Sequence, residues 1–308
     1  MNFYLIFSKV SVIFLLIIVG FILSKKKILS SEGQKELTSL LLYVLLPCTL
    51  IKSFDIEYSS DILARGLKMS VFMFAIYIVS YLIATLVSKK YAEPENRRDI
   101  HVLSMILPNV GFMGYPIVNA LIGPEAIIYA VMCNVGFEFF AWTFGIRTVS
   151  RNSPVKASGN PVLSLLSTPA IMAILAGMVL FTTPLYIPEP LISTVNLLAA
   201  AMSPVAMIIV GISLANSDLS RIIKNRYIYI SSSVRLVLIP LITMFALKAL
   251  SAADMSYYIP MIVISMPTAG YATMFATKYE NDSLLASEMI SMSTLMSLIS
   301  IPVILSLL

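Results

Sequence analysis

The apolar residues of this chain fall into long runs separated by short polar segments, and ten of these runs have about the length of a membrane-spanning helix. About 20 apolar residues in a helix cross the hydrocarbon core of a bilayer, and no polar segment between the runs much exceeds a dozen residues. The pattern predicts an all-α integral membrane protein with ten transmembrane helices. The expected spans are residues 3–24, 36–54, 66–88, 101–119, 125–148, 162–182, 190–214, 227–250, 257–277 and 284–307.

The composition agrees with this interpretation. Of the 308 residues, 58% are hydrophobic and only 12% are charged, whereas soluble domains have roughly 25% charged residues. The mean hydropathy is +0.91. The net charge of +5 comes from lysines and arginines in the loops, so it predicts contact with a lipid bilayer and no nucleic-acid partner. Cys48 and Cys133 both fall within spans and predict no disulfide.

The basic residues are distributed unevenly between the two sides of the predicted bundle. Fifteen lie in the loops that follow spans 1, 3, 5, 7 and 9, and four lie in the opposite loops. Basic loops are retained in the cytoplasm during insertion. The distribution therefore predicts a multi-pass protein of the cell (plasma) membrane with both termini outside and the loop between spans 5 and 6 in the cytoplasm.

The two halves of the chain resemble each other. Four pairs of residues recur in the same order at a nearly constant offset of 157 or 159 positions. Because each half has five spans, the second copy enters the membrane from the opposite side, which predicts a 5+5 inverted repeat over residues 1–152 and 160–308. The matched pairs are Gly20 and Gly177, Pro47 and Pro204, Pro108 and Pro267, and Gly111 and Gly270.

Spans 4 and 9 are interrupted by helix-breaking residues at matching places. The segments are "ILPNVGFMGYP" (residues 106–116) and "ISMPTAGYA" (residues 264–272). Proline removes a backbone donor, and backbone groups that are freed inside a bilayer must be buried in protein or line a polar cavity. One such break is a harmless kink in many membrane helices. A symmetric pair favours a transport site at the two breaks.

The two prolines, Pro108 and Pro267, and four residues beside them are candidates for substrate binding. Asn109 follows the first break, where its amide either donates to a carboxylate or ion site or only satisfies the broken backbone. Thr268 is its counterpart in the second half. Gly111 and Gly270 permit close approach of a ligand rather than binding it by side chain.

Two charged residues lie near the middle of predicted spans, Glu138 in span 5 and Arg235 in span 8. A charge at that depth is costly and is a functional hypothesis by default. Three interpretations are open: a structural ion pair, a coupling role for Glu138, or an Arg235 guanidinium that holds the substrate carboxylate. Asn134 lies one helical turn before Glu138 and is expected in the same polar cluster. Tyr271 is interpreted as a packing residue.

No catalytic or nucleotide-binding constellation is visible. The chain has a single histidine, His101, interpreted as an interfacial residue, and it has no glycine-rich phosphate loop and no metal-ligand spacing. These observations predict that the protein is not an enzyme or an ATP-driven pump. No cofactor is expected beyond a coupling proton or sodium ion.

The segment "PNVGFMGYPIVNALIGPEAIIYAVMCNVGFEFFAWTFG" (residues 108–145) resembles the auxin efflux carrier family, and the resemblance extends over the whole chain. That family includes the plant PIN-formed exporters and malate permease-like proteins, and it is similar in fold to the bile-acid sodium symporters. The resemblance implies a scaffold domain from residues 1–54 and 162–214 and an elevator-type transport domain from residues 66–148 and 227–307. It also implies that the broken helices cross at Pro108 and Pro267, with Pro47 on the scaffold face near the substrate.

The function expected from these observations is secondary transport of a small organic anion, an auxin- or malate-like carboxylate. The alternative is a transporter-like membrane sensor or regulator that binds the ligand without net transport. The acid, the coupling ion, the direction of transport and the oligomeric state, a homodimer included, stay open at this point.

Overall fold

A computed structural model of the protein describes residues 3–91, 93–157, 160–183, 187–252 and 254–308, which are helical with connecting turns and contain no strand. Several predicted spans are built from two or three helical pieces. The helices are α1 (Phe3–Lys25), α2 (Ser31–Leu40), α3 (Leu46–Ser53), α4 (Ser60–Ser88), α5 (Glu95–Ile106), α6 (Tyr115–Leu121), α7 (Ile127–Phe140), α8 (Ile146–Arg151), α9 (Pro161–Leu166), α10 (Pro169–Thr182), α11 (Glu189–Ala215), α12 (Leu219–Lys224), α13 (Arg226–Ser233), α14 (Ile239–Ala249), α15 (Met255–Ile264), α16 (Tyr271–Lys278) and α17 (Ser283–Ser306).

Five short segments complete the helical rods. Four are π-helical turns, which continue α2 into α3, precede α6, and join α7 to α8 and α13 to α14; one is a 3₁₀ turn before α7. Such π turns are frequent at functional sites. The segments are η1 (Leu41–Leu45), η2 (Val110–Gly114), η3 (Pro124–Ala126), η4 (Ala141–Gly145) and η5 (Val234–Leu238).

Helix occupies each of the ten ranges predicted to span the membrane. Among the described residues, seven helical rods are long and apolar enough to cross a bilayer. Predicted spans 4, 6 and 9 contain shorter apolar helices instead, Val110–Leu121, Pro169–Thr182 and Met255–Ile264. An all-helical integral membrane protein is therefore confirmed. The seven long rods are Ile6–Lys25, Ser31–Ser53, Ser60–Ser88, Pro124–Arg151, Glu189–Ala215, Arg226–Ala249 and Ser283–Ser306.

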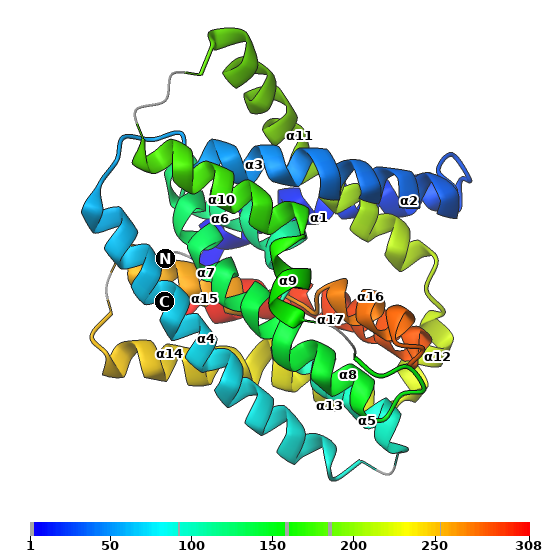
Figure 1. Ribbon diagram of the computed structural model, residues 1–308. Coiled ribbons are helices and arrows are strands. Elements are labelled where there is room, and N and C mark those ends of the chain that lie inside the picture. The colour runs from blue at the N-terminus through cyan, green and yellow to red at the C-terminus, as the bar shows by residue number, and fades with distance from the viewer. Residues whose placement is uncertain (1–2, 92, 158–159, 184–186, 253) are drawn as a thin grey trace.

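Large apolar side chains are exposed over the outside of the bundle, as expected for a surface that faces lipid. Val71 on α4, Leu197 on α11 and Ile299 on α17 are 71%, 76% and 73% exposed. In Figure 1 both chain ends lie toward the left of the view, whereas the turns after α1, α11 and α16 lie toward the right.

The helices pack in two groups. One group consists of α1, α3, α10 and α11, and the other of α4, α5, α7, α13, α15, α16 and α17. Figure 1 shows α3 and α10 in the upper part of the bundle and α4, α13 and α14 in the lower part. The groups meet where α1 contacts α17 and where α3 contacts α7, and α1 and α11 also contact α6 and the π-helical turn η2 of the first break, respectively.

Glycines hold each group together by letting two backbones touch. A Cβ on Gly211 of α11 would collide with the carbonyl oxygen of Ile17 on α1. In the other group, a Cβ on Gly136 of α7 would collide with the carbonyl oxygen of Ser70 on α4. Small residues permit this close packing of membrane helices, so each pair is a tight seam within its own group.

Candidate functional site

The two predicted breaks lie against each other in the interior of the bundle. Helix α5 ends at Ile106 and α15 ends at Ile264, and an antiparallel β-bridge joins Pro108 to Thr268. The Asn109 amide donates to the Pro267 carbonyl at 2.7 Å, and the Ala269 amide donates to the Leu107 carbonyl at 2.8 Å. Each break thus provides hydrogen-bond partners for the other, which is required of unwound backbone away from water.

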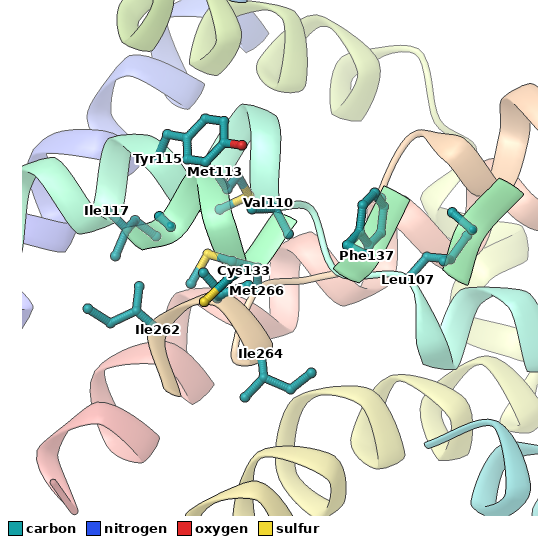
Figure 2. Close-up of a cluster of buried hydrophobic side chains, with 14 of the residues drawn as sticks. Leu107, Val110, Met113, Tyr115, Ile117, Cys133, Phe137, Ile262, Ile264 and Met266 are labelled. Atoms are coloured by element: carbon teal, nitrogen blue, oxygen red, sulfur yellow. The ribbon is translucent and has the colours of Figure 1, made fainter. Parts of the chain in front are cut away.

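Apolar side chains surround this crossing, so the unwound backbone is covered by protein. Figure 2 shows Val110 beside the first break, Met266 beside the second, and Cys133 and Phe137 of α7 close to both. All four are at most 3% exposed. The crossing is consequently a buried junction.

Arg235 binds the carbonyl ends of both half-helices that lead into the crossing. It lies in η5, and its side chain is fully buried. Nε donates to the Met266 carbonyl at 3.1 Å, Nη1 donates to the Met105 carbonyl at 3.2 Å, and Nη2 donates to the Ile264 carbonyl. The C-terminal end of a helix is a partial negative charge with unsatisfied carbonyls. One guanidinium therefore neutralises the ends of α5 and α15 together.

The ion pair that was considered between Glu138 and Arg235 is not formed in the described part of the chain. The donors of Arg235 are directed at backbone carbonyls, and Glu138 has other partners. The expectation that two buried charges need each other overlooked the broken helices, because half-helix ends also present charge. A fully buried guanidinium with carbonyl partners is not placed to hold a substrate carboxylate in this conformation.

Glu138 is surrounded by hydrogen-bond donors, and no described residue is its cationic partner. It lies on α7 and is 3% exposed. The Tyr271 hydroxyl donates to Oε1 of Glu138 at 2.9 Å and lies 3.0 Å from Oε2. The Trp142 indole donates to Oε2 at 3.2 Å, and the Asn134 amide donates to Oε1 at 3.4 Å. Tyr271 is the first residue of α16, directly after the second break. The carboxylate is therefore linked to the start of this half-helix through the Tyr271 side chain.

Asn109 caps the half-helix that follows the first break. Its Oδ1 accepts a hydrogen bond from the Phe112 amide at 3.2 Å, as an N-cap residue does. The side chain is 7% exposed, and within the described residues its Nδ2 group has no hydrogen-bond partner. The oxygen satisfies the broken backbone, and the nitrogen remains a free donor within the described residues. Binding of a substrate or ion by this donor stays a prediction.

Thr268 is fully buried and its polar groups are occupied. Its hydroxyl donates to the Ser104 carbonyl at 2.9 Å, and its backbone amide donates to the Ser293 hydroxyl at 3.0 Å. The two breaks occupy matching positions in the sequence repeat, but Thr268 is fully buried whereas Asn109 is 7% exposed. In this conformation Thr268 supports the crossing, and its binding of substrate stays a prediction.

Gly111 and Gly270 both face open space. A Cβ added to either residue would meet no atom within 4 Å. Gly270 is exposed, and Gly111 is partly exposed. Elsewhere in the bundle an added Cβ usually meets a neighbour closely, as at Gly211. The two matched glycines therefore mark free volume on the rim of the crossing.

Pro47 lies at the first turn of α3, in the other helix group from the crossing. Helix α3 packs against α10 and α11 and also contacts α7, which has Glu138 on it. The proline is partly exposed. Its contact with substrate stays a prediction.

Three polar residues of the site were not identified from the sequence as site residues. Tyr271 was expected to pack, yet its hydroxyl binds Glu138. Trp142 lies four residues after Glu138 on the same helical face, and that spacing was the available signal. Ser293 of α17 meets the second break across the fold, so no local pattern indicates it.

Two unwound segments pair inside an apolar helical bundle, an arrangement that is typical of membrane transporters. The sequence pattern of the membrane transport protein family matches residues 5–305, and the chain belongs to that family. The resemblance to auxin efflux-like transporters is thereby confirmed at the level of the family.

Two similar proteins come from archaea. An uncharacterized transporter of Methanocaldococcus jannaschii is 26% identical over 297 residues, which cover 95% of each chain. An uncharacterized transporter of Methanothermobacter thermautotrophicus is 24% identical over 299 residues, which cover 94% of each chain. Both similarities extend over nearly the full length, so they concern the complete set of helices.

Proposed function

We propose that the protein is a secondary transporter of a small organic anion, an auxin- or malate-like carboxylate, with its binding site on the rim of the crossing. The observations that support this most are the open space beside Gly111 and Gly270 and the free Nδ2 donor of Asn109, two residues before Gly111. Half-helices begin on this side of the crossing, and helix N-termini attract anions. The opposite, carbonyl ends are already neutralised by Arg235.

The two packed helix groups support an elevator-type movement. The backbone seams at Gly211 and Gly136 lie within the groups, so each group is suited to move as one body. In this proposal α1, α3, α10 and α11 form the scaffold, and the helices around the crossing carry the substrate. The ten helical ranges then all cross the membrane as a 5+5 inverted repeat, with both termini outside, in the plasma membrane.

Uptake by purified protein in liposomes tests this function. A panel of radiolabelled mono- and dicarboxylates is offered under imposed proton, sodium and exchange gradients. Saturable uptake of at least one acid that empty liposomes lack is expected. Saturable binding without flux under every gradient would instead support the alternative function, a membrane sensor.

The first prediction separates the two functions of Asn109. Asn109→Asp keeps an oxygen that caps the Phe112 amide, but it removes the free Nδ2 donor and adds a negative charge. We expect a loss of carboxylate uptake, because the substrate is repelled, and a lower melting temperature, because a charge is costly at this depth. Asn109→Ala is the comparison, and it is expected to cost about 1 kcal/mol of stability through loss of the cap. Normal uptake by the Asp variant would contradict binding at this residue.

The second prediction concerns coupling to protons. An anion on the rim of the crossing would be repelled by an ionised Glu138, whose partner Tyr271 directly follows Gly270. Anion binding and protonation of Glu138 therefore favour each other, and this coupling is reciprocal. Uptake should rise with an inward proton gradient in the wild type but not in Glu138→Gln. The exposed Glu57→Gln variant is the control and should keep the proton dependence. Equal proton dependence in Glu138→Gln and wild type would contradict the coupling role.

A further inference from the structure

A second pocket lies at the end of the bundle where α5 and α13 begin, away from the crossing. Its volume is about 460 Å³, and its walls come from the segment before α5, from α5 itself, from α12 and from the start of α13. These segments include the loops that follow predicted spans 3 and 7, and the distribution of basic residues predicts that both loops are cytoplasmic. Four lining side chains are basic and one, Glu93, is acidic. The basic residues are Arg97, Arg221, Lys224 and Arg226.

Two of the four basic residues are already paired with carboxylates. Arg97 contacts Glu93 at 3.2 Å and Asp282 at 3.0 Å. Arg221 contacts Glu288 at 2.8 Å. These pairs link the pocket wall to α17 and fix its shape, but they leave little free positive charge on either arginine.

Lys224 and Arg226 have no carboxylate partner among the described residues, and both are exposed. The Arg226 guanidinium is nevertheless held in place, because Nη2 donates to the Tyr227 hydroxyl at 2.9 Å and the group lies 4.9 Å from the centre of the Tyr227 ring. Tyr227 in turn stacks on Tyr91 with ring centres 4.5 Å apart. The pocket therefore presents two uncompensated positive charges, one of them preorganised on an aromatic stack.

The surroundings of the pocket are apolar and exposed. Ile223, which adjoins Lys224, is 63% exposed, and Ile230, one helical turn after Arg226, is 42% exposed. In an integral membrane protein such side chains face lipid. A ligand with a charged head and an apolar chain would match this combination of a basic pocket and an apolar rim.

We propose that this pocket binds a phosphate group, and that its source is the headgroup of an anionic phospholipid. Lysine and arginine are the common partners of phosphate oxygens, and basic pockets between transmembrane helices on the cytoplasmic side bind lipid headgroups. A volume of about 460 Å³ accommodates a small ligand group of this kind. Because α12 connects α11 of one helix group to α13 of the other, a bound headgroup would tether this connection.

The test compares lipids and a free anion on the full-length purified protein. Binding of phosphatidylglycerol, phosphatidylcholine and inorganic phosphate is measured by native mass spectrometry and by thermal stabilisation. The Lys224→Gln, Arg226→Gln double variant is compared with Lys89→Gln, Lys90→Gln, which removes two exposed charges from the same predicted side outside the pocket lining. Melting temperatures in phosphatidylcholine establish that both variants are folded.

We expect phosphatidylglycerol to bind more tightly than phosphatidylcholine, and this preference to fall roughly 30-fold in the pocket variant, since each charge near the membrane surface is worth about fivefold in binding. The control variant should keep the preference. Stabilisation by inorganic phosphate that the pocket variant loses would support the phosphate site and assign it to a free anion. An equal phosphatidylglycerol preference in both variants, or no preference in the wild type, would overturn the proposal.

Discussion

Replacing Arg235 with methionine is expected to lower the stability of the protein by about 3–5 kcal/mol, the range found when one partner of a buried charged interaction is removed. The substitution keeps a long side chain but leaves the carbonyls of Met105, Ile264 and Met266 without their donors in a buried site. Thermal unfolding in detergent, followed by the fluorescence of Trp142, should show a decrease on the order of 10 °C.

The control for this experiment is Arg65→Met, which makes the same chemical change at an exposed site. Arg65 pairs with Asp61 one turn away on α4, and both side chains are largely exposed. Exposed pairs contribute about 0–1 kcal/mol, so the melting temperature should hardly change. Arg235→Lys should fall between the two, because one ammonium group cannot reproduce the planar fork of donors. Equal melting temperatures for Arg235→Met and Arg65→Met would show that the carbonyl ends do not need this guanidinium.

Arg235 also shows how far the candidate site could be predicted from the sequence. Its depth in an apolar run was enough to predict that it is buried and important. Its partners were not predictable, because they are backbone carbonyls of two helix ends, and those ends become available only after the tertiary structure brings the breaks together. From the sequence alone, Glu138 was chosen as the partner of Arg235 because both residues lie near the middle of a predicted span.

The breaks themselves were predictable, because proline and glycine change the local backbone whatever surrounds them. Both breaks could be located in the sequence. No sequence pattern, however, predicted the register of the β-bridge between them, in which Pro108 faces Thr268. In this register Thr268 contacts Ser104 of α5, the helix that leads into the first break, and Ser293 of α17. His101 is a similar case: it was expected at the interface, but it is buried, and Ser231 and Glu93 lie within hydrogen-bond distance of its ring nitrogens.

Replacing Gly111 with alanine is expected to reduce carboxylate uptake roughly 10-fold to 200-fold without destabilising the protein. The new methyl group meets no protein atom within 4 Å, and the residue does not have a positive φ, so the folded protein accommodates it. Replacing glycine by alanine at a compatible position even stabilises a protein by about 0.4–1 kcal/mol. The methyl group occupies the space that we assign to the substrate, and one methylene in a binding pocket changes specificity by about this factor. Gly270→Ala should behave in the same way.

Substitutions at two further glycines serve as controls. They distinguish a blocked binding site from a loss of stability of the whole protein. Gly33→Ala, in α2, brings the added Cβ into ordinary contact with Leu29, and it should change neither uptake nor melting temperature. Gly211→Ala forces a Cβ against the Ile17 carbonyl, and it should lower both. A Gly111 variant that loses uptake with a wild-type melting temperature therefore has a blocked site. If it instead melts as early as the Gly211 variant, or transports normally, the open space beside Gly111 is not where the substrate binds.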